Sequence, residues 1–395
     1  MMQFLEERKK GDVQSQTIPD ECGFRLYMCA DSLRELAKSF EKKKVTETQD
    51  RRACFEEERL RENCDVIAGH LTELAQIMEQ TADEVAEMTP LEEKTWKKLN
   101  HALREKGICL EGACLLPSNE YGRKLSLSLH SAYVEGVQSE EVLGVLEKVF
   151  EQKYCLSFAS PEWITRESAL FHFGEQPKYM AFTGFARVVK GREEISGDNY
   201  SILQSECGKL TLLLSDGTGS GQQACDGSDF VLDLVERLLE AGYRQETALR
   251  MVNSAILAKG EELGHPTLDM CRLDLQKGSC DFCKAGGAVS FCKRGEEVEV
   301  IPGGQLPLGI FQDLEPHRNY YHLEEGDSVI LMTDGVLEAF REKGYEEAVR
   351  NALSSMKEAG PREIAEKLMH LAIFASEGNI RDDMTILVAT LWKTP

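Results

Sequence analysis

Residues 209–221, KLTLLLSDGTGSG, decide the fold expected for the second half of the chain. The apolar run LTLLL predicts a buried β-strand, and Asp216 stands where that strand ends. A carboxylate at the end of a buried strand costs free energy unless something neutralises it. The stretch therefore predicts a sheet whose edge carries a charged site.

The glycines that follow Asp216 predict a tight loop leading into a helix. Gly217, Gly219 and Gly221 allow positive φ angles and close approach of the backbone. A phosphate-binding P-loop would need a lysine after the glycines, and Gln222 stands there instead. This disfavours a nucleotide-binding protein and leaves a loop that exposes backbone groups beside Asp216.

Other acidic residues also stand at predicted strand ends. Asp198 lies in SGDNY before a strand, Asp334 follows SVILMT, and Asp382 and Asp383 precede MTILVATLW. Each one alone fits an ordinary Asp-Gly turn or a helix N-cap. Together they predict carboxylates at one sheet edge. Such oxygen-only ligands favour Mg²⁺ or Mn²⁺.

The rest of this region predicts an α+β domain. Helices are expected between residues 221 and 262, and a pair broken at Gly360-Pro361 between residues 345 and 375. Runs of strands with segregated helices indicate sheets packed under helical layers. The expected strands are LTLLLSD, MCRLDL, CDFCKAG, AVSFCKR, EVEVI, DSVILMTDG and MTILVATLW.

The pattern divides the chain into three regions, residues 1–89, 90–178 and 179–395. The first is expected to be helical and coiled-coil-like, with a polar hinge at 42–52, and it either dimerises or packs as a hairpin within one chain. The second reads as a small α/β regulatory module. The expected a/d seam of the helical region is Leu60, Cys64, Ile67, Leu71, Leu74, Met78, Val85 and Met88.

Composition limits the classes of function. The chain has 395 residues and a net charge of −22, so nucleic-acid binding is a poor expectation. Its 13 cysteines show no repeated spacing and fit reduced thiols of a cytosolic protein, so Cys280 and Cys283 are interpreted as structural rather than zinc ligands. No apolar run approaches the roughly 20 residues that span a bilayer. We expect a cytoplasmic protein, or the cytoplasmic part of a membrane-anchored one.

Five motifs in order resemble one family. SGDNY, SDGTGSG, TLDMCRLDL, MTDGVLEAF and RDDMTILVATLW look like the successive motifs of the PPM (PP2C-like) metal-dependent phosphatases, over about residues 182–392. The resemblance is closest to the stage II sporulation protein E (SpoIIE) group. It implies an α-β-β-α sandwich with a binuclear Mn²⁺ or Mg²⁺ centre.

The resemblance also implies roles for individual residues. Asp216 would bridge two metals, the Gly217 carbonyl would complete one, Asp334 and Asp382 would hold the other, and Asp198 would hold or orient metal-bound water. Many eukaryotic members have a glutamate where Gly197 stands, so one metal would have fewer protein ligands. Lys190 or Arg192 could replace the family's phosphate-binding arginine, and residues Gly217, Thr218 and Gly219 would form a regulatory loop.

The expected function is therefore a protein serine/threonine phosphatase. The resemblance implies a homodimer whose partner is a phosphorylated anti-sigma factor antagonist, so that dephosphorylation activates a sporulation sigma factor. The alternative is a pseudophosphatase, a signalling scaffold whose metals are structural or absent. Retention of all the motif aspartates argues against that alternative.

Overall fold

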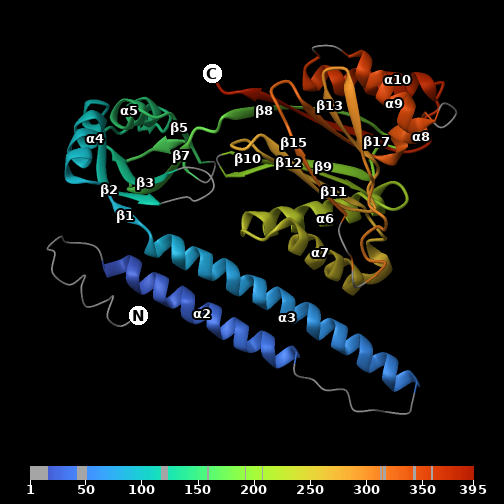
Figure 1. Cartoon of the computed structure of the whole chain (residues 1–395), viewed down its shortest axis with the longest axis horizontal. Helices are drawn as coiled ribbons and strands as arrows, with labels where there is room; N and C mark the ends of the chain where they lie inside the picture. The colour runs from blue at the N-terminus through green and yellow to red at the C-terminus, as the bar shows by residue number, and fades with distance from the viewer. Residues whose placement is uncertain are drawn as a thin grey trace. The chain divides into compact units, whose positions relative to one another are not determined.

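The computed structural model describes residues 17–41, 51–116, 123–157, 160–191, 193–206, 208–311, 314, 317–340, 344–356 and 359–395. Most of the predicted polar hinge (residues 42–50) and Arg192 lie outside the described residues. The chain forms two compact units, residues 1–137 with 164–170, and residues 138–163 with 171–395 (Figure 1). The three-region division stays a prediction.

Two long helices, α2 (Thr17–Glu41) and α3 (Arg51–Ala86), pack against each other as a hairpin. Most of the buried side chains of this pair are alanines, because small residues allow two helix backbones to approach closely, and Cys64 of the predicted seam is buried with them. Arg34 of α2 pairs with Glu79 of α3 across the hairpin. The buried alanines are Ala30, Ala37, Ala68, Ala75 and Ala82.

The larger residues of the predicted seam lie differently. Ile67 is exposed, and Leu71, Leu74 and Met78 are only half-buried, whereas the alanine stripe is fully enclosed. The seam prediction weighted apolar side chains by size, but close helix packing selects small ones. The hairpin alternative is therefore found within one chain, and dimerisation stays a prediction.

A small α/β module follows the hairpin. Its sheet has the strand order β1-β2-β3-β7-β5, and β4 pairs with β6. Helix α5 buries Val142, Val145 and Leu146 on its apolar face. The elements are β1 (Thr89–Pro90), α4 (Glu93–Glu105), β2 (Ile108–Leu116), β3 (Lys124–Ser131), β4 (Val137–Gln138), α5 (Glu141–Phe150), β5 (Tyr154–Leu156), β6 (Trp163–Ile164) and β7 (Ala169–Glu175).

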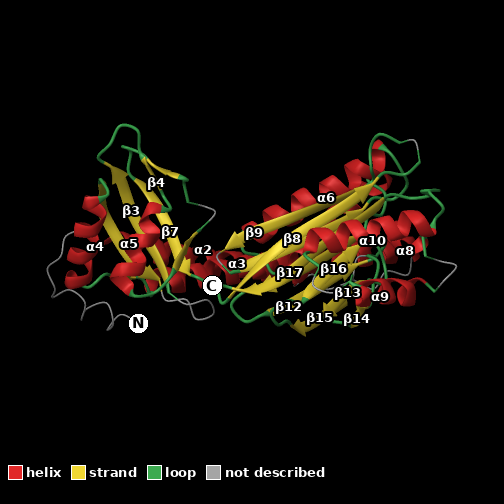
Figure 2. Ribbon diagram, turned by 90° about the horizontal axis from the view of Figure 1, so that it is seen from above, coloured by secondary structure: helices red, strands yellow, loops and turns green. Residues whose placement is uncertain are grey.

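The remaining elements build an α-β-β-α sandwich of two five-stranded antiparallel sheets (Figure 2). We call the sheet with order β15-β12-β11-β10-β9 the first sheet, and that with order β14-β13-β16-β17-β8 the second. Helices α6 and α7 cover the first sheet, and α8, α9 and α10 cover the second. The predicted α+β class is confirmed.

The first sheet consists of β9 (Asp198–Glu206), β10 (Lys209–Asp216), β11 (Leu268–Asp274), β12 (Ser279–Ala285) and β15 (His317–His322). The second consists of β8 (Tyr179–Val188), β13 (Ser290–Arg294), β14 (Glu297–Ile301), β16 (Ser328–Met332) and β17 (Met384–Lys393). The helices are α6 (Gln222–Glu240), α7 (Gln245–Lys259) with the short η2 (Gly260–Glu262), α8 (Asp334–Glu338), α9 (Tyr345–Ser355) and α10 (Pro361–Ala375). All seven expected strands form, whereas β15 was not expected because HRNYYH lacks an apolar alternation.

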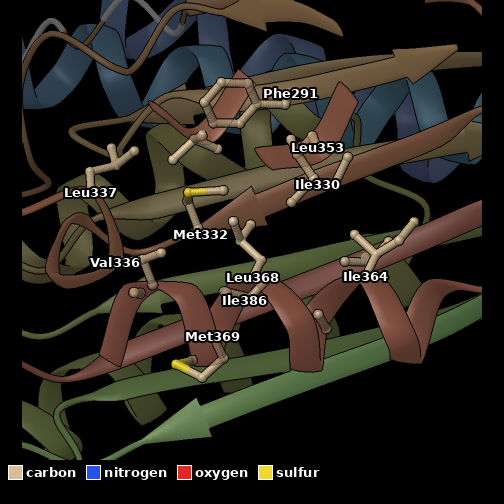
Figure 3. Packing of buried hydrophobic residues seen from close by; sticks show 14 of the residues in the cluster. Phe291, Ile330, Met332, Val336, Leu337, Leu353, Ile364, Leu368, Met369 and Ile386 are labelled. Atoms are coloured by element: carbon tan, nitrogen blue, oxygen red, sulfur yellow. The ribbon is translucent and has the colours of Figure 1, made fainter. Parts of the chain in front are cut away.

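Two apolar layers hold the sandwich together. Between the sheets, Leu212 and Leu214 of β10 pack with Leu331 of β16 and Leu387 of β17. Between the second sheet and its helices, a layer that includes Met332, Val336, Leu368 and Ile386 fills the space (Figure 3). Side chains of β10, β16 and β17 pack tightly in these layers. Because protein interiors are close-packed, the residues at the ends of these strands are held in fixed positions.

No helix in the described part of the chain is both long and apolar enough to cross a bilayer.

Candidate metal centre

The two sheets bring four predicted aspartates to one end of the sandwich. Asp198 begins β9 and lies opposite Asp216, the last residue of the neighbouring strand β10. Asp334 follows β16 and is the first residue of α8, and Asp382 stands two residues before β17, the strand that pairs with β16. Each sheet thus contributes two carboxylates.

The electrostatics of Asp216 show that these side chains are close together. Burial raises the pKa of Asp216 to about 9, and the charges of Asp198, Asp334 and Asp382 all add to the increase. Burial likewise raises the pKa of Asp334, with Asp382 and Glu338 as the next causes. Among the described residues, neither Asp216 nor Asp334 forms an ion pair with a basic side chain. Asp216 and Asp334 therefore carry negative charge that no basic side chain among the described residues pairs with.

Asp198 is the most deeply buried member of the group, at 1% exposed. The Thr333 hydroxyl donates a hydrogen bond to its Oδ2 at 2.8 Å, whereas its Oδ1 has no hydrogen-bond partner among the described residues. Burial is the main cause that raises the pKa of Asp198 to about 6, and the charge of Asp383 adds to it. One oxygen is thus fixed and the other is free to accept a ligand.

Asp383 has a different task from Asp382. Its Oδ1 accepts the Lys190 backbone N–H at 2.7 Å, and its Oδ2 accepts the Gly197 N–H at 2.6 Å. Both oxygens are therefore occupied in holding the loop that leads to Asp198. Asp382 is half-buried, and the Lys190 ammonium lies 3.6 Å from its Oδ1. This leaves Asp382 as the better candidate for a metal ligand.

The loop at Gly217 is packed directly under helix α6. A Cβ on Gly217 would lie 2.0 Å from the Ala224 carbonyl oxygen, so only glycine fits there. Gly197 is equally confined, because a Cβ there would lie 2.8 Å from the Ala224 Cβ. The glutamate of many eukaryotic relatives therefore has no room at Gly197. The position of the Gly217 carbonyl depends on α6.

The next loop residues contact the segment after η2. The Thr218 hydroxyl accepts a hydrogen bond from the His265 backbone N–H at 2.9 Å. Gly219 has a φ of +98° and no neighbour that a Cβ would meet, so its requirement for glycine is conformational. These contacts couple the loop to both ends of the α6–α7 layer.

The donor set fits hydrated divalent cations. Among the described residues, no group of three or more acidic, histidine or cysteine side chains is placed to hold one metal ion by itself, so water would have to supply the remaining ligands. Mg²⁺ keeps several waters and is commonly bound through one or two carboxylates, so an open arrangement suits it. The free Oδ1 of Asp198 and the mutual proximity of the other carboxylates are the features that such ions would satisfy.

Sequence reasoning missed several supporting residues. Thr333 and Arg187 hold Asp198, the first through its carboxylate and the second through its backbone carbonyl. Asp269 and Lys284 form a buried pair near Asp216. Lys284 gave a signal, as a charged residue within the expected strand CDFCKAG, whereas Asp269 lies just before the expected strand MCRLDL. Thr333 and Arg187 gave no such signal.

Comparisons with known proteins agree on one family. Residues 206–392 match the family described as Stage II sporulation protein E (SpoIIE). The chain is 33% identical over 220 residues to stage II sporulation protein E of Bacillus subtilis (strain 168), which covers 55% of this chain and 27% of that protein. It is 34% identical over 220 residues to the Priestia megaterium protein of the same name, covering 55% and 38%. The matched part is thus well under half of either relative.

Other matches support the fold. Phosphoserine phosphatase RsbU of B. subtilis is 22% identical over 204 residues, covering 50% of this chain and 59% of that protein. Among solved structures, the PP2C phosphatase domain with a fragment of the regulatory domain of SpoIIE from B. subtilis superimposes with a TM-score of 0.62 at 26% identity. That match covers 88% of this chain and 97% of the other, which confirms the predicted PP2C-like fold.

Proposed function

We propose that this chain, whose residues 206–392 form a domain of the SpoIIE family of PP2C-like serine phosphatases, hydrolyses phosphoserine and phosphothreonine esters of proteins with two bound divalent cations. The observation that carries the proposal is the gathering of Asp198, Asp216, Asp334 and Asp382 at one end of the sandwich, where burial and the charges of the other three raise the pKa of Asp216 and so favour bound cations. Mn²⁺ and Mg²⁺ are the ions that oxygen ligands favour.

Each aspartate has a proposed role. Asp216 and the Gly217 carbonyl would hold one of the ions, Asp334 and Asp382 would hold the other, and Asp216 would be shared between them. Asp198 orients water through its free oxygen. Bound cations supply Lewis-acid stabilisation of the phosphoryl oxygens and lower the pKa of a bound water.

Neighbouring residues of the chain hold the proposed metal ligands in place. Thr333 and Arg187 fix Asp198, and Asp383 fixes the loop from Lys190 to Gly197. Lys190 is the proposed phosphate contact, because its ammonium already lies 3.6 Å from Asp382 at the edge of the group. Arg192 is proposed as a second contact from sequence alone.

The proposed substrate is a small phosphorylated anti-sigma factor antagonist, and the result is activation of a sporulation sigma factor in the cytoplasm. This rests on similarity to proteins named stage II sporulation protein E and to one named phosphoserine phosphatase RsbU. The surface charge of −22 suits a protein rather than a nucleic-acid substrate.

The test is release of phosphate from a phosphoserine antagonist protein by the full chain, with MnCl₂ and with EDTA. We expect turnover with Mn²⁺, none in EDTA and none by Asp216→Ala. The rival scaffold function predicts that the chain binds the phosphoprotein without releasing phosphate at any metal concentration. That outcome would overturn the proposal.

Regulation is proposed to act through the loop at Gly217, Thr218 and Gly219. Helix α6 lies against Gly217, so a small shift of that helix would move the carbonyl that completes one metal site. The upstream hairpin and a homodimer are the proposed source of the shift. Deletion of residues 1–89 should change the activity or the metal requirement, and unchanged kinetics at matched metal concentrations would remove the idea.

A further inference from the structure

A charged pair is buried between the two sheets beside the aspartate group. Asp269 of β11 and Lys284 of β12 lie opposite each other in the first sheet and are 2% and 1% exposed. The Lys284 ammonium donates to Asp269 Oδ2 at 2.8 Å. Burying two charges costs free energy that a single contact rarely repays, so stability is a weak reason for such a pair.

The same ammonium group reaches across to the second sheet. Lys284 Nζ also donates to the Ala288 carbonyl at 2.6 Å and to the Ser290 hydroxyl at 2.8 Å. Its three protons are therefore all used. Ser290 begins β13, which pairs with β16, the strand that ends beside Asp334. The contact thus ties the sheet that carries Asp216 to the sheet that carries Asp334.

The second oxygen of Asp269 is left without a partner. Oδ1 is buried and accepts no hydrogen bond among the described residues. A Cβ on Gly287 would lie 1.8 Å from this oxygen, so glycine is what allows the carboxylate to sit there.

Asp269 also lines a cavity of about 70 Å³ together with Asp216, Thr267 and Asp334. A polar cavity of this size has room for water, which needs hydrogen-bond partners on its walls. Asp269 and two members of the aspartate group, Asp216 and Asp334, thus line one small polar space.

We propose that Asp269, held by Lys284, is a positioning residue for the cation site. The pair fixes the spacing of the two sheets where their aspartates meet, and Oδ1 accepts a hydrogen bond from a water of the cation's hydration shell in the shared cavity. This inference rests on the proposed function. It assigns to the buried pair a role in metal affinity rather than in phosphate contact.

The test is the affinity of the folded full chain for Mn²⁺, measured by isothermal titration calorimetry well below the unfolding temperature. Asp269→Asn keeps the shape of the side chain and removes the charge that orders Lys284. Loss of a residue that supports metal ligands typically weakens metal affinity about ten- to hundredfold, and we expect a loss in this range. The control is Asp327→Asn, which removes the charge of another buried aspartate, one paired with the half-exposed Arg294 outside the aspartate group.

The result that overturns the proposal is an Asp269→Asn affinity within twofold of the parent protein. An equal loss in Asp327→Asn would overturn it as well, because the effect would then be general destabilisation. If Asp269→Asn does not fold, the Mn²⁺ affinity of Ser290→Ala is the test. This variant removes only the hydrogen bond from Lys284 to the second sheet. We expect that variant to bind Mn²⁺ more weakly by at least about threefold, and unchanged affinity would overturn the proposal.

Mn²⁺ binding by the parent protein distinguishes a failure of this inference from a failure of the proposed function. If the parent chain binds no Mn²⁺, the proposed function and the inference both fail. If the parent binds Mn²⁺ and Asp269→Asn binds it equally well, only the inference fails.

Discussion

Strand β16 has an aspartate beyond each of its ends, and the two have opposite surroundings. Asp327 before the strand is 4% exposed, and its Oδ2 accepts hydrogen bonds from Arg294 Nε at 2.9 Å, Arg294 Nη2 at 2.6 Å and the Glu324 N–H at 2.8 Å. Asp334 after the strand has acidic neighbours instead, Asp382 and Glu338.

The difference separates a structural carboxylate from one that needs a ligand. At Asp327 the fold supplies the compensating cation and donors, so the site is complete. At Asp334, which is exposed to solvent, the fold supplies further negative charge from Asp382 and Glu338 and no compensating basic side chain among the described residues, so a bound cation would relieve the repulsion. Substitutions in the aspartate group should therefore reduce activity and raise the stability of the metal-free protein. Substitution of Asp327 should leave activity nearly unchanged and lower stability.

The largest effect is expected on catalysis. Asp216→Ala removes the carboxylate placed at the centre of the group. Bound cations supply several kcal/mol of stabilisation and about 1.4 kcal/mol is a factor of ten, so kcat should fall roughly a thousandfold or more. Phosphate release at saturating Mn²⁺ measures this. Asp327→Asn should keep kcat within a few fold of the parent. Equal losses of kcat in both variants would contradict the distinction between the structural Asp327 and the aspartate group.

A steric change in the loop should come next. Gly217→Ala places a Cβ 2.0 Å from the Ala224 carbonyl oxygen, so either the loop or the first turn of α6 must shift. Displacing the Gly217 carbonyl should weaken Mn²⁺ binding by about ten- to hundredfold. Activity titrated against Mn²⁺ should show a higher half-saturating concentration. Gly144→Ala is a suitable control, because Gly144, like Gly217, has no positive φ, and a Cβ there meets nothing within 4 Å. A normal Mn²⁺ requirement in Gly217→Ala would show that this carbonyl is not a ligand.

Stability without metal should change in opposite directions at the two positions. In EDTA at pH 8 the fold must keep Asp216 protonated although the unfolded chain does not, and Asp216→Asn removes this cost, so it should raise the melting temperature. Asp327→Asn loses charged hydrogen bonds worth about 1.5–3 kcal/mol each and should lower it. Thermal unfolding followed by circular dichroism gives both values. A lower melting temperature for Asp216→Asn in EDTA would mean that the aspartate group is not under repulsion.

The same repulsion predicts a pH dependence of the metal-free protein. The pKa of Asp216 is about 9 in the fold and about 3.8 as the ordinary value, so its protonated form favours the folded state. The stabilisation is present below pH 4 and is lost as the pH rises toward 9. Urea unfolding in EDTA should show the parent losing stability over this range more steeply than Asp216→Asn. Parallel curves would contradict the prediction.

The smallest effect is expected at Lys190. Its ammonium is partly exposed and lies 3.6 Å from Asp382, and such contacts contribute little to stability. Lys190→Ala should raise KM for the phosphoprotein by about threefold to tenfold, which corresponds to about 1 kcal/mol, and leave kcat nearly unchanged. Steady-state kinetics separate the two constants. A fall in kcat with constant KM would assign Lys190 a role in the transition state instead.

Much of the sandwich could be predicted because its strands are apolar and its aspartates stand at their ends. The run at residues 210–214 and the four candidate aspartates gave both the fold class and one end of the sandwich. What could not be predicted depends on contacts between distant strands. Thr333 reaches Asp198 across 135 positions of sequence, and Asp383 reaches Gly197 across 186. Sequence spacing contains no information on such pairs.

The prediction for the helical region differed from the structure for another reason. Its apolar pattern predicted a seam of large residues, but α2 and α3 approach closely enough that the alanines are enclosed instead. The period of the apolar residues identified the helices. It could not show which face of each helix packs against the other helix, because the sequence does not give their relative position. The β15 strand was missed for the related reason that its polar sequence is stabilised by pairing with β12.

The central claim is tested most directly by a crystal structure of the full chain grown with MnCl₂, with anomalous diffraction recorded near the manganese absorption edge. The account predicts anomalous peaks in contact with the carboxylates of Asp216 and Asp334, and none beside Asp327. A catalytically active crystal whose manganese lies elsewhere, or whose aspartates are paired with basic side chains, would contradict it.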